Sequence, residues 1–417
     1  MESNRPNLLF LSLVEPSLHS NGPAQRAYFT LQAFSRFYDI HLVILEVGFY
    51  EKPRSTGPDP LPCQSMTNIQ VPMGLDCGYF TRRGIFRLSP QLFFSLYQRP
   101  SSERFFSEMT AVQLATKLAG TPFDILHGFR LYTLPWAKII ATRLKIPLLQ
   151  IDLDDLESQT RKRLADLYRS RRLRHLAAQF EADAQEFLKV ERTLDHSCRR
   201  VFVCSEVDRH HLQNQFPALE TVVLPNVVRL PRTQPIQVAH QPFTFLFIGT
   251  LGYFPNQDAL EYFCATSWPM IVSRARGAVE LCIVGDGLPS HIKTWLARQP
   301  GVVLSGWVAN LEEVYARADA VVIPLRAGGG TRIKLLEALA HGVPVVSTTL
   351  GAEGIEVQSG THAILANTPE EFAAGCLQLV QDAALRNHLA QNGKALVSTL
   401  YTEDVLTRRI GALGKRG

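Results

Sequence analysis

The feature that most constrains the fold of this chain is a regular alternation of short apolar runs with longer segments of helical periodicity. The runs are continuous and rich in Val, Ile, Leu and Phe, as in parallel strands that helices cover on both faces. This alternation predicts doubly wound α/β sheets. The expected strands are Asn7–Leu13, Ile40–Leu45, Phe123–His127, Pro147–Ile151, Arg200–Cys204, Thr221–Leu224, Phe243–Ile248, Glu280–Val284, Val302–Ser305, Ala320–Leu325 and Val343–Ser347, and the expected helices include Gln25–Arg36, Leu134–Arg143, Asp258–Arg274, Leu311–Arg317 and Arg332–His341.

One proline-rich segment, Pro225–Pro242, interrupts this alternation and shows no sustained periodicity. Such a segment is typical of a linker between domains, and 417 residues are enough for two or three domains. We therefore expect an N-terminal domain over residues 1–230 and a second α/β domain over residues 231–396. The tail, residues 397–417, is helical in pattern and is expected to pack back on the N-terminal domain.

Composition excludes several classes of protein. An apolar fraction of 46% and a charged fraction of 19% are typical of globular domains, and a net charge of +5 is too small for a dedicated nucleic-acid binder. The apolar run Leu8–Val14 is too short to span a bilayer and is followed by Glu15 and Pro16, so neither a signal peptide nor a membrane anchor is expected. Seven cysteines without a Cys-x-x-Cys pair favour a reducing, cytoplasmic location.

The segment Ala327–Glu337, AGGGTRIKLLE, carries the clearest chemistry. Three consecutive glycines let the backbone approach a ligand closely, and a helix predicted to begin near Thr331 would direct its positive end at the same place. Anions bind readily at such helix ends. Arg332 and Lys334 add two cations where the helix dipole disfavours them, which indicates an anionic ligand. The alternative is a strand–turn–helix connection with packing glycines and two surface cations.

The motifs around this segment point to a family. They are FLFIGTLGYFPN at Phe245–Asn256, LCIVGDGLP at Leu281–Pro289, the stretch Val302–Leu325, and GGGTRIKLLEALAHGVPVVSTTLGAEGI at Gly328–Ile355. In their order and spacing they resemble the donor domain of the GT-B glycosyltransferases, in particular the retaining family 4. The resemblance implies a GT-B architecture, with two Rossmann-like doubly wound domains facing a cleft.

The resemblance also implies roles for single residues. Gly249 would begin the loop that faces the donor, and Glu337 would hold the ribose hydroxyls. The backbone at Trp307 and Val308 would contact the nucleobase. On the N-terminal domain the resemblance implies a donor-phosphate contact at Gly22 and a catalytic histidine at His127, which would line the cleft near the transferred sugar.

Two positions depart from the family pattern. Gly329 stands where the family usually carries a first glutamate, and the loop after Gly249 has no cation. We infer that Arg332 and Lys334 replace the missing charge and that Glu353 takes over the sugar contact. The predicted donor-binding set is completed by the turn residues Gly329, Gly330 and Thr331.

The predicted function follows from these assignments: a hexosyltransferase that moves a sugar from a nucleoside-diphosphate sugar to a saccharide or lipid-linked acceptor, in cell-surface polysaccharide or glycolipid synthesis. Arg332 and Lys334 would stabilise the leaving diphosphate, so that neither a metal nor a further cofactor is needed. The alternatives are a non-catalytic nucleotide-sugar-binding module and a GT-B epimerase. A dehydrogenase is disfavoured because Ile283–Gly287 lacks the third glycine of the dinucleotide motif.

The acceptor is expected on the N-terminal domain. Asp152, Asp154 and Asp155 form an acidic strand end, which we interpret as a loop that orients the acceptor hydroxyl rather than as a metal site. The basic run Arg161–His175 and the mixed basic and aromatic segment Thr81–Phe106 favour docking on the anionic inner face of a membrane. An ordinary solvated helix and an irregular loop are the alternatives.

Overall fold

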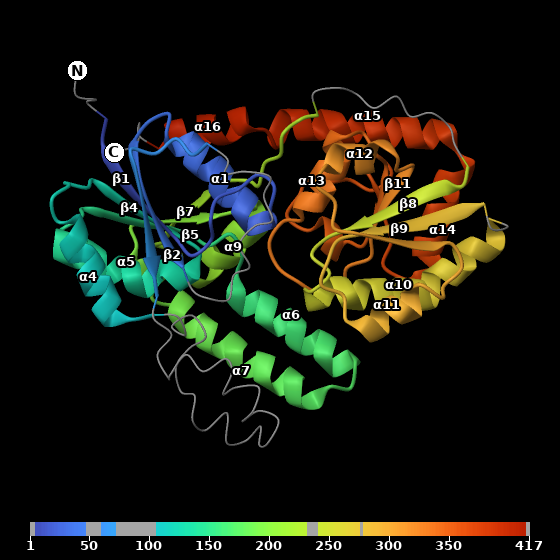
Figure 1. Cartoon of the computed structure of the whole chain (residues 1–417), viewed down its shortest axis with the longest axis horizontal. Coiled ribbons are helices and arrows are strands. Elements are labelled where there is room, and N and C mark those ends of the chain that lie inside the picture. Colours follow the sequence, from blue (N-terminus) through green and yellow to red (C-terminus); the bar gives the residue numbers. More distant parts are fainter. Residues whose placement is uncertain (1–4, 47–59, 72–105, 232–240, 276–277, 414–417) are drawn as a thin grey trace. The chain divides into compact units, whose positions relative to one another are not determined.

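The computed structural model describes residues 5–46, 60–71, 106–231, 241–275 and 278–413. The chain divides into two compact units, one formed by Met1–Pro225 with Thr407–Gly417 and the other by Asn226–Leu406. Each unit is built on one parallel sheet, and Figure 1 shows helices on both faces of each sheet. The predicted pair of doubly wound α/β sheets is therefore confirmed.

Unit 1 contains a seven-stranded parallel sheet of order β3-β2-β1-β4-β5-β6-β7. The strand order reverses between β1 and β4, so the crevice beyond their carboxyl ends is the topological switch point. The strands are β1 (Asn7–Ser12), β2 (Asp39–Glu46), β3 (Ser65–Gln70), β4 (Ile125–Phe129), β5 (Leu148–Asp152), β6 (Arg200–Val203) and β7 (Glu220–Val223). The helices are α1 (Gly22–Phe34), α4 (Glu108–Leu118), α5 (Leu134–Leu144), α6 (Glu157–Ser170), α7 (Arg174–Glu191), α8 (Leu194–Ser197) and α9 (Glu206–Gln215), with a 3₁₀ turn η3 (Leu131–Thr133).

Unit 2 repeats the plan with a six-stranded parallel sheet of order β10-β9-β8-β11-β12-β13. Its switch point lies between β8 and β11. The strands are β8 (Phe243–Ile248), β9 (Val279–Val284), β10 (Val302–Gly306), β11 (Ala320–Ile323), β12 (Val345–Ser347) and β13 (Ile364–Leu365). The helices are α10 (Phe254–Arg274), α11 (Ser290–Leu296), α12 (Leu311–Ala316), α13 (Ile333–Ala340), α14 (Pro369–Gln381) and α15 (Ala383–Leu400), with a 3₁₀ turn η4 (Leu350–Ala352).

The central strands are apolar on both faces, and helices bury both faces of each sheet. Every residue of β11 is buried, and the last four residues of β8 are buried as well. Helices α10 and α14 pack together under the unit 2 sheet, and α13 packs with α15. Strong end signals fix the helices: Thr368 and Glu371 form a capping box at the start of α14.

The expected unit boundaries shift by a few residues in the structure. Unit 2 begins at Asn226 rather than 231, and the chain returns to unit 1 at Thr407 rather than 397. The backbone explains both shifts, because the Val228 N–H donates to the Tyr401 carbonyl and ties both segments to unit 2. The last helix, α16 (Glu403–Gly411), crosses this boundary, and its Arg409 donates to the carbonyl of Val223 in unit 1.

The basic run Arg161–His175 does not form one continuous helix. Helix α6 ends at Ser170, Arg172 adopts a left-handed conformation with φ of 61°, and α7 begins at Arg174. The run therefore covers the end of α6, a tight turn and the start of α7, which pack against each other as a hairpin. The other segment expected on the membrane, Thr81–Phe106, lies outside the described residues except for Phe106.

Candidate active site

Two loops meet at the switch point of unit 2. One leaves the carboxyl end of β8 and enters α10, and the other leaves β11 and enters α13. Because β8 and β11 are neighbours, both loops lie at the position where open α/β sheets bind their ligands. The first loop contains Gly249, and the second is the glycine-rich turn identified in the sequence.

The structure brings Gly249 and Lys334 together. A Cβ atom at Gly249 would lie 2.8 Å from Lys334 Nζ and 3.0 Å from Asn256 Nδ2, so only glycine leaves room for them. The Lys334 ammonium group donates to Asn256 Oδ1 at 3.0 Å. The Asn256 amide is itself oriented, because its Nδ2 donates to the Thr250 carbonyl at 2.8 Å. The loop that lacks a cation of its own thus holds the cation of the next loop.

The charge on Lys334 is poorly compensated. Its ammonium group lies 4.8 Å from the centre of the Phe247 ring, and no described carboxylate lies within salt-bridge distance of it. The pKa of Lys334 falls from 10.5 to about 7, mainly because of burial; Arg332 also lowers it, whereas Glu337 acts in the opposite direction. An anion bound here would relieve this cost.

Arg332 is the second cation of the site. Its Nη1 donates to the Gly329 carbonyl, while its buried Nε and Nη2 have no hydrogen-bond partner among the described residues. Gly328 has φ of 124° and would place a Cβ only 3.0 Å from Arg332 Nη2, so this glycine is required by both backbone and packing. Two buried guanidinium donors without acceptors are costly unless a ligand supplies the acceptors.

The helix begins later than we expected. Helix α13 starts at Ile333 with Arg332 as its N-cap, and Lys334 lies in its first turn. Thr331 does not cap the helix with its side chain; its hydroxyl accepts a 2.6 Å hydrogen bond from Asn226 Nδ2, which anchors the turn to the start of unit 2. The preceding Gly330 has φ of 63°, a left-handed conformation.

The remaining donor-side residues lie around the same edge of the sheet. Glu337 accepts a hydrogen bond from the Tyr315 hydroxyl at 3.1 Å. Trp307 and Val308 follow the end of β10, and the Trp307 side chain is 44% exposed. Glu353 follows the turn η4 after β12, and the carboxyl end of β12 pairs with that of β11 at Ser347 and Ile323.

Several residues that support the site were not identified from the sequence. Besides Asn256, Asn226 and Tyr315, the structure shows a paired interaction in which Arg326 donates from Nε and Nη2 to the buried carboxylate of Asp258, at 2.9 and 2.7 Å. This pair ties the start of the glycine-rich turn to α10. The sequence shows Arg326 as a cation two residues before the glycines. Spacing alone does not predict that it pairs with Asp258, which lies 68 positions earlier.

His127 does not have the surroundings that we expected. It is fully buried in β4, and its ring lies among Phe10, Phe34 and Phe202 with centroid distances of 4.8, 4.9 and 5.6 Å. Burial lowers the pKa of His127 to about 3, and the nearby Arg26 lowers it as well. Its environment is therefore that of a core histidine of unit 1, hydrogen-bonded through Nδ1 to Gln150 at 3.2 Å. Gly22, by contrast, lies at the first position of α1, after the N-cap Asn21.

The acidic strand end of unit 1 is an internal ion network. Asp152 is fully buried and its Oδ1 accepts from Arg26 Nε and Nη2, at 3.1 and 2.9 Å. Asp154 lies 3.7 Å from both Arg26 and Arg130. Asp155 accepts from Thr160 at 2.7 Å, and burial together with Glu157 raises its pKa to about 7. Within the described residues, no group of three or more His, Cys, Asp and Glu side chains is arranged to hold a metal ion.

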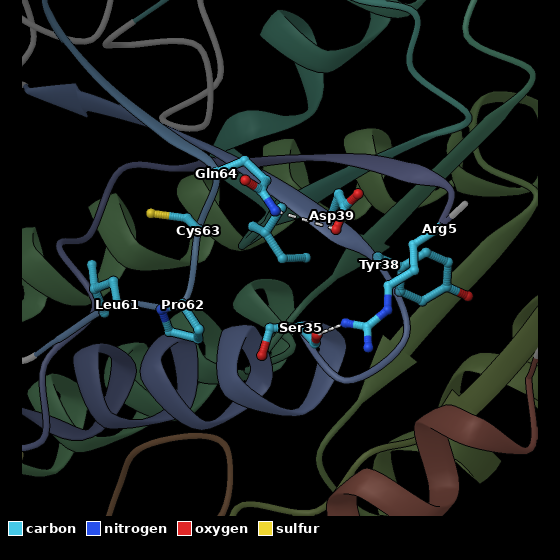
Figure 2. A pocket seen from close by; sticks show the side chains of 9 residues that line it. Arg5, Ser35, Tyr38, Asp39, Leu61, Pro62, Cys63 and Gln64 are labelled. Atoms are coloured by element: carbon cyan, nitrogen blue, oxygen red, sulfur yellow. Dashed lines mark hydrogen bonds between the residues drawn. The ribbon is translucent and has the colours of Figure 1, made fainter. Parts of the chain in front are cut away.

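A shallow hollow of about 320 Å³ lies at the opposite end of the unit 1 sheet, where β2 begins (Figure 2). Arg5 donates to the Ser35 carbonyl at 3.2 Å on its rim, and Gln64 donates to Asp39 at 3.4 Å. Because α/β sheets bind ligands beyond the carboxyl ends of their strands, this hollow at the amino end is not a candidate for the catalytic site. No helix of the described ranges is long and apolar enough to cross a membrane.

Comparison with known proteins agrees with the geometry of unit 2. Residues 242–382 match the family model described as glycosyl transferases group 1. A Klebsiella pneumoniae protein described as an uncharacterized 44.6 kDa protein in the cps region is 23% identical over 163 residues, a match that covers 37% of this chain and 42% of that protein.

Two solved structures share the fold over almost the whole chain. HepE of Anabaena in complex with UDP and glucose has a TM-score of 0.67 at 15% identity, covering 99% of this chain and 100% of that one. Sucrose-phosphate synthase from Thermosynechococcus elongatus has a TM-score of 0.66 at 15% identity, covering 99% of both chains. The chain therefore has the fold of the GT-B glycosyltransferases, and residues 242–382 of its second unit match the model of glycosyl transferases group 1. This fold and this match in unit 2 support a glycosyltransferase activity.

Proposed function

We propose that this chain is a hexosyltransferase that moves a sugar from a nucleoside-diphosphate sugar to a saccharide or lipid-linked acceptor, in the synthesis of cell-surface polysaccharide or glycolipid. The observation that carries the proposal is the pair of weakly compensated cations, Arg332 and Lys334, beside Gly249 at the switch point of unit 2. The UDP and glucose bound by HepE and the cps region of the Klebsiella relative support the choice of donor and of product.

The transfer breaks the bond between the anomeric carbon and a diphosphate oxygen and forms a bond to the acceptor oxygen, whose proton leaves with the diphosphate. Negative charge builds on the diphosphate in the transition state. Fixed cations at that position stabilise the transition state more than the ground state. The free Nε and Nη2 of Arg332 and the Lys334 ammonium supply these cations without a metal, and the family resemblance favours retention of the anomeric configuration.

Titration calorimetry with UDP-, GDP- and ADP-sugars tests the donor site. Lys334→Met and Arg332→Met are each expected to weaken binding of the preferred donor about 10- to 100-fold, because each removes hydrogen bonds between charged groups. Lys293→Met, which removes an exposed lysine of α11 in the same unit, is the matched control and is expected to bind normally. Unchanged affinity in both site variants would falsify the proposed anion site.

The alternatives give different products from the same preparation. A binding module would bind the donor but release no nucleoside diphosphate with any acceptor extract. An epimerase would convert the donor to an isomeric sugar nucleotide. The proposal requires release of nucleoside diphosphate together with a glycosylated acceptor.

We also propose that the turn between α6 and α7 docks on an anionic membrane surface, so that the chain acts in the cytoplasm at the inner face of the membrane. Arg172 and Arg174 are exposed there, on both sides of Leu173, whose side chain is 37% exposed. Basic side chains near anionic lipid contribute about 1 kcal/mol each.

Sedimentation with vesicles tests this docking. The wild type is expected to bind vesicles of phosphatidylcholine with one third phosphatidylglycerol, and Arg172→Glu/Arg174→Glu to lose most of that binding. The control, Lys117→Glu/Arg143→Glu, reverses two exposed charges elsewhere on unit 1. Equal binding of both double variants would exclude the turn as the docking site.

A further inference from the structure

Tyr315 is a buried phenol that contacts the carboxylate of Glu337. It lies in the short helix α12 and is fully buried, and its hydroxyl is 3.1 Å from Glu337 Oε2. A carboxylate only accepts hydrogen bonds, so the phenol donates. Burial raises the pKa of Tyr315 well above its ordinary value, and Glu337 raises it further, so that the phenol keeps its proton at every physiological pH.

His341 fixes the Tyr315 ring from the other side. The two rings are stacked, with their centroids 4.5 Å apart and their planes at 21°. His341 Nδ1 lies 2.8 Å from the Glu337 carbonyl oxygen, and a carbonyl oxygen only accepts, so Nδ1 carries the proton. Burial lowers the pKa of His341, which keeps the ring neutral near pH 7. One turn of α13 therefore holds the histidine, and the histidine holds the tyrosine.

The same short helix connects two predicted parts of the donor site. Helix α12 begins at Leu311, shortly after the Trp307–Val308 segment, and is capped by Asn310, whose side chain accepts from the Glu312 N–H at 3.0 Å. If α12 changed position, two groups would move at the same time: the segment expected at the nucleobase, and the Tyr315 hydroxyl that contacts Glu337. The hydrogen bond from Tyr315 thus links the position of the expected nucleobase contact to that of the expected ribose contact.

We infer that Tyr315 is a positioning residue for ribose recognition, holding one oxygen of Glu337 so that the other meets the ribose hydroxyls. The inference rests on the proposed function and on the ribose contact that the family resemblance implies for Glu337. A glutamate side chain has several rotamers of similar energy, and a ligand that must select one of them binds more weakly. Tyr315 and the stacked His341 make that selection before the donor arrives.

The test combines Tyr315→Phe with two ligands, UDP and 2′,3′-dideoxy-UDP, in titration calorimetry. The wild type is expected to prefer UDP. The variant keeps the ring and its stacking but loses the hydroxyl, so UDP binding is expected to weaken roughly tenfold. Binding of the dideoxy ligand is expected to change less than about twofold, because that ligand offers Glu337 nothing to contact.

Tyr401→Phe is the matched control. Tyr401 is also buried, and its hydroxyl accepts a 2.9 Å hydrogen bond from the Glu356 N–H, which belongs to neither of the two loops of the site. It reports what the loss of such a hydroxyl does to unit 2 as a whole, and UDP preference is expected to be intact. A second cycle uses Glu337→Ala, in which adding Tyr315→Phe is expected to have no further effect on UDP.

The outcomes separate the two levels of the argument. A wild type that binds no nucleoside diphosphate overturns the proposed function and this inference with it. A wild type that prefers UDP, together with a Tyr315→Phe variant that keeps the full preference, overturns this inference alone. Equal weakening of both ligands by Tyr315→Phe would also overturn it, because that result indicates only a structural role.

Discussion

The carboxyl ends of the two sheets each hold a cation near the switch point, but the cations have opposite surroundings. Arg26 of unit 1 donates twice to Asp152, lies 3.7 Å from Asp154, and donates from Nη1 to the Leu224 carbonyl at 2.9 Å. Lys334 of unit 2 has an amide oxygen and an aromatic ring beside it. The first charge is neutralised within the protein, and the second is not.

The pKa values follow the same contrast. Burial by itself acts to lower the pKa of Arg26, but Asp152, Cys204 and Asp154 together outweigh it and the pKa is raised. At Lys334 burial and Arg332 act together and the pKa falls to about 7. The two units share one sheet plan but differ at their switch points. Unit 1 has an internal ion pair there, whereas the two site cations of unit 2 lack a compensating carboxylate among the described residues. The second switch point is where we propose that an anionic donor binds.

The largest expected effect comes from breaking the satisfied site. Arg26→Met leaves the fully buried carboxylate of Asp152 without its cation, and removal of one partner from a buried ion pair costs about 3–5 kcal/mol. We expect the free energy of unfolding of unit 1 to fall by this amount in urea denaturation. Donor affinity of the folded variant is expected to be unchanged, because the pair lies within unit 1.

The double variant Arg26→Met/Asp152→Asn separates charge from packing. It removes both charges but keeps a side-chain oxygen at position 152. In the wild type, Asp152 Oδ1 accepts from the Asp154 N–H at 2.9 Å, and the asparagine oxygen can do the same. Most of the lost stability is expected to return. If the single variant is as stable as the wild type, or if it binds the donor more weakly while fully folded, the assignment of Arg26 to a structural pair is wrong.

The next effect in size is a pH dependence at the unsatisfied site. Below pH 7 Lys334 is already charged in the free protein, so donor affinity is expected to be flat. Above pH 7 the free protein loses that proton, while a bound diphosphate raises the lysine pKa and restores it. The dissociation constant for the donor should therefore rise with pH, by at most about tenfold per unit, which is about 1.4 kcal/mol.

Calorimetry with UDP-glucose between pH 6 and pH 9 measures this dependence, because the sugar diphosphate does not titrate in that range. Proton uptake on binding, from buffers with different ionisation enthalpies, should approach one proton above pH 7. Lys334→Arg keeps its charge throughout and is expected to lose the dependence. The same slope in wild type and Lys334→Arg would assign the titration to another group.

Local patterns in the sequence were sufficient for the sheets and for the turn at the donor side. Continuous apolar runs gave the central strands, and β8 has the bounds that its run indicated. The edge strand β3 was missed because its residues are mostly exposed and polar, and β13 because it has only two residues. Lys334 could be identified because a cation in the first turn of a helix is disfavoured by the helix dipole, and the sequence alone shows this conflict.

Long-range packing could not be predicted in the same way. Tyr315 meets Glu337 across 22 positions, and Lys334 meets Asn256 across 78, so no spacing rule connects them. The acidic strand end was interpreted as a loop that orients the acceptor, and its ion network was missed, because Arg26 lies 126 residues away from Asp152. A motif match gives the position of a residue along a strand, but the three rings around His127 depend on how α1, β1 and β6 pack.

The smallest effect is expected at His127. His127→Leu removes the bond to Gln150 and fills the space among the three rings, so the free energy of unfolding should change by no more than about 1.5 kcal/mol. Since the folded pKa of about 3 lies below the unfolded value of 6.5, wild-type stability decreases as pH falls below 6.5, and the variant should lack this contribution. Glycosyl transfer by the folded variant should remain within about twofold of the wild type, because a neutral, fully buried ring has no access to donor or acceptor. A loss of transfer of about a hundredfold without a loss of stability, equal to about 2.7 kcal/mol in the barrier, would return His127 to the reacting groups and remove the contrast between the two units.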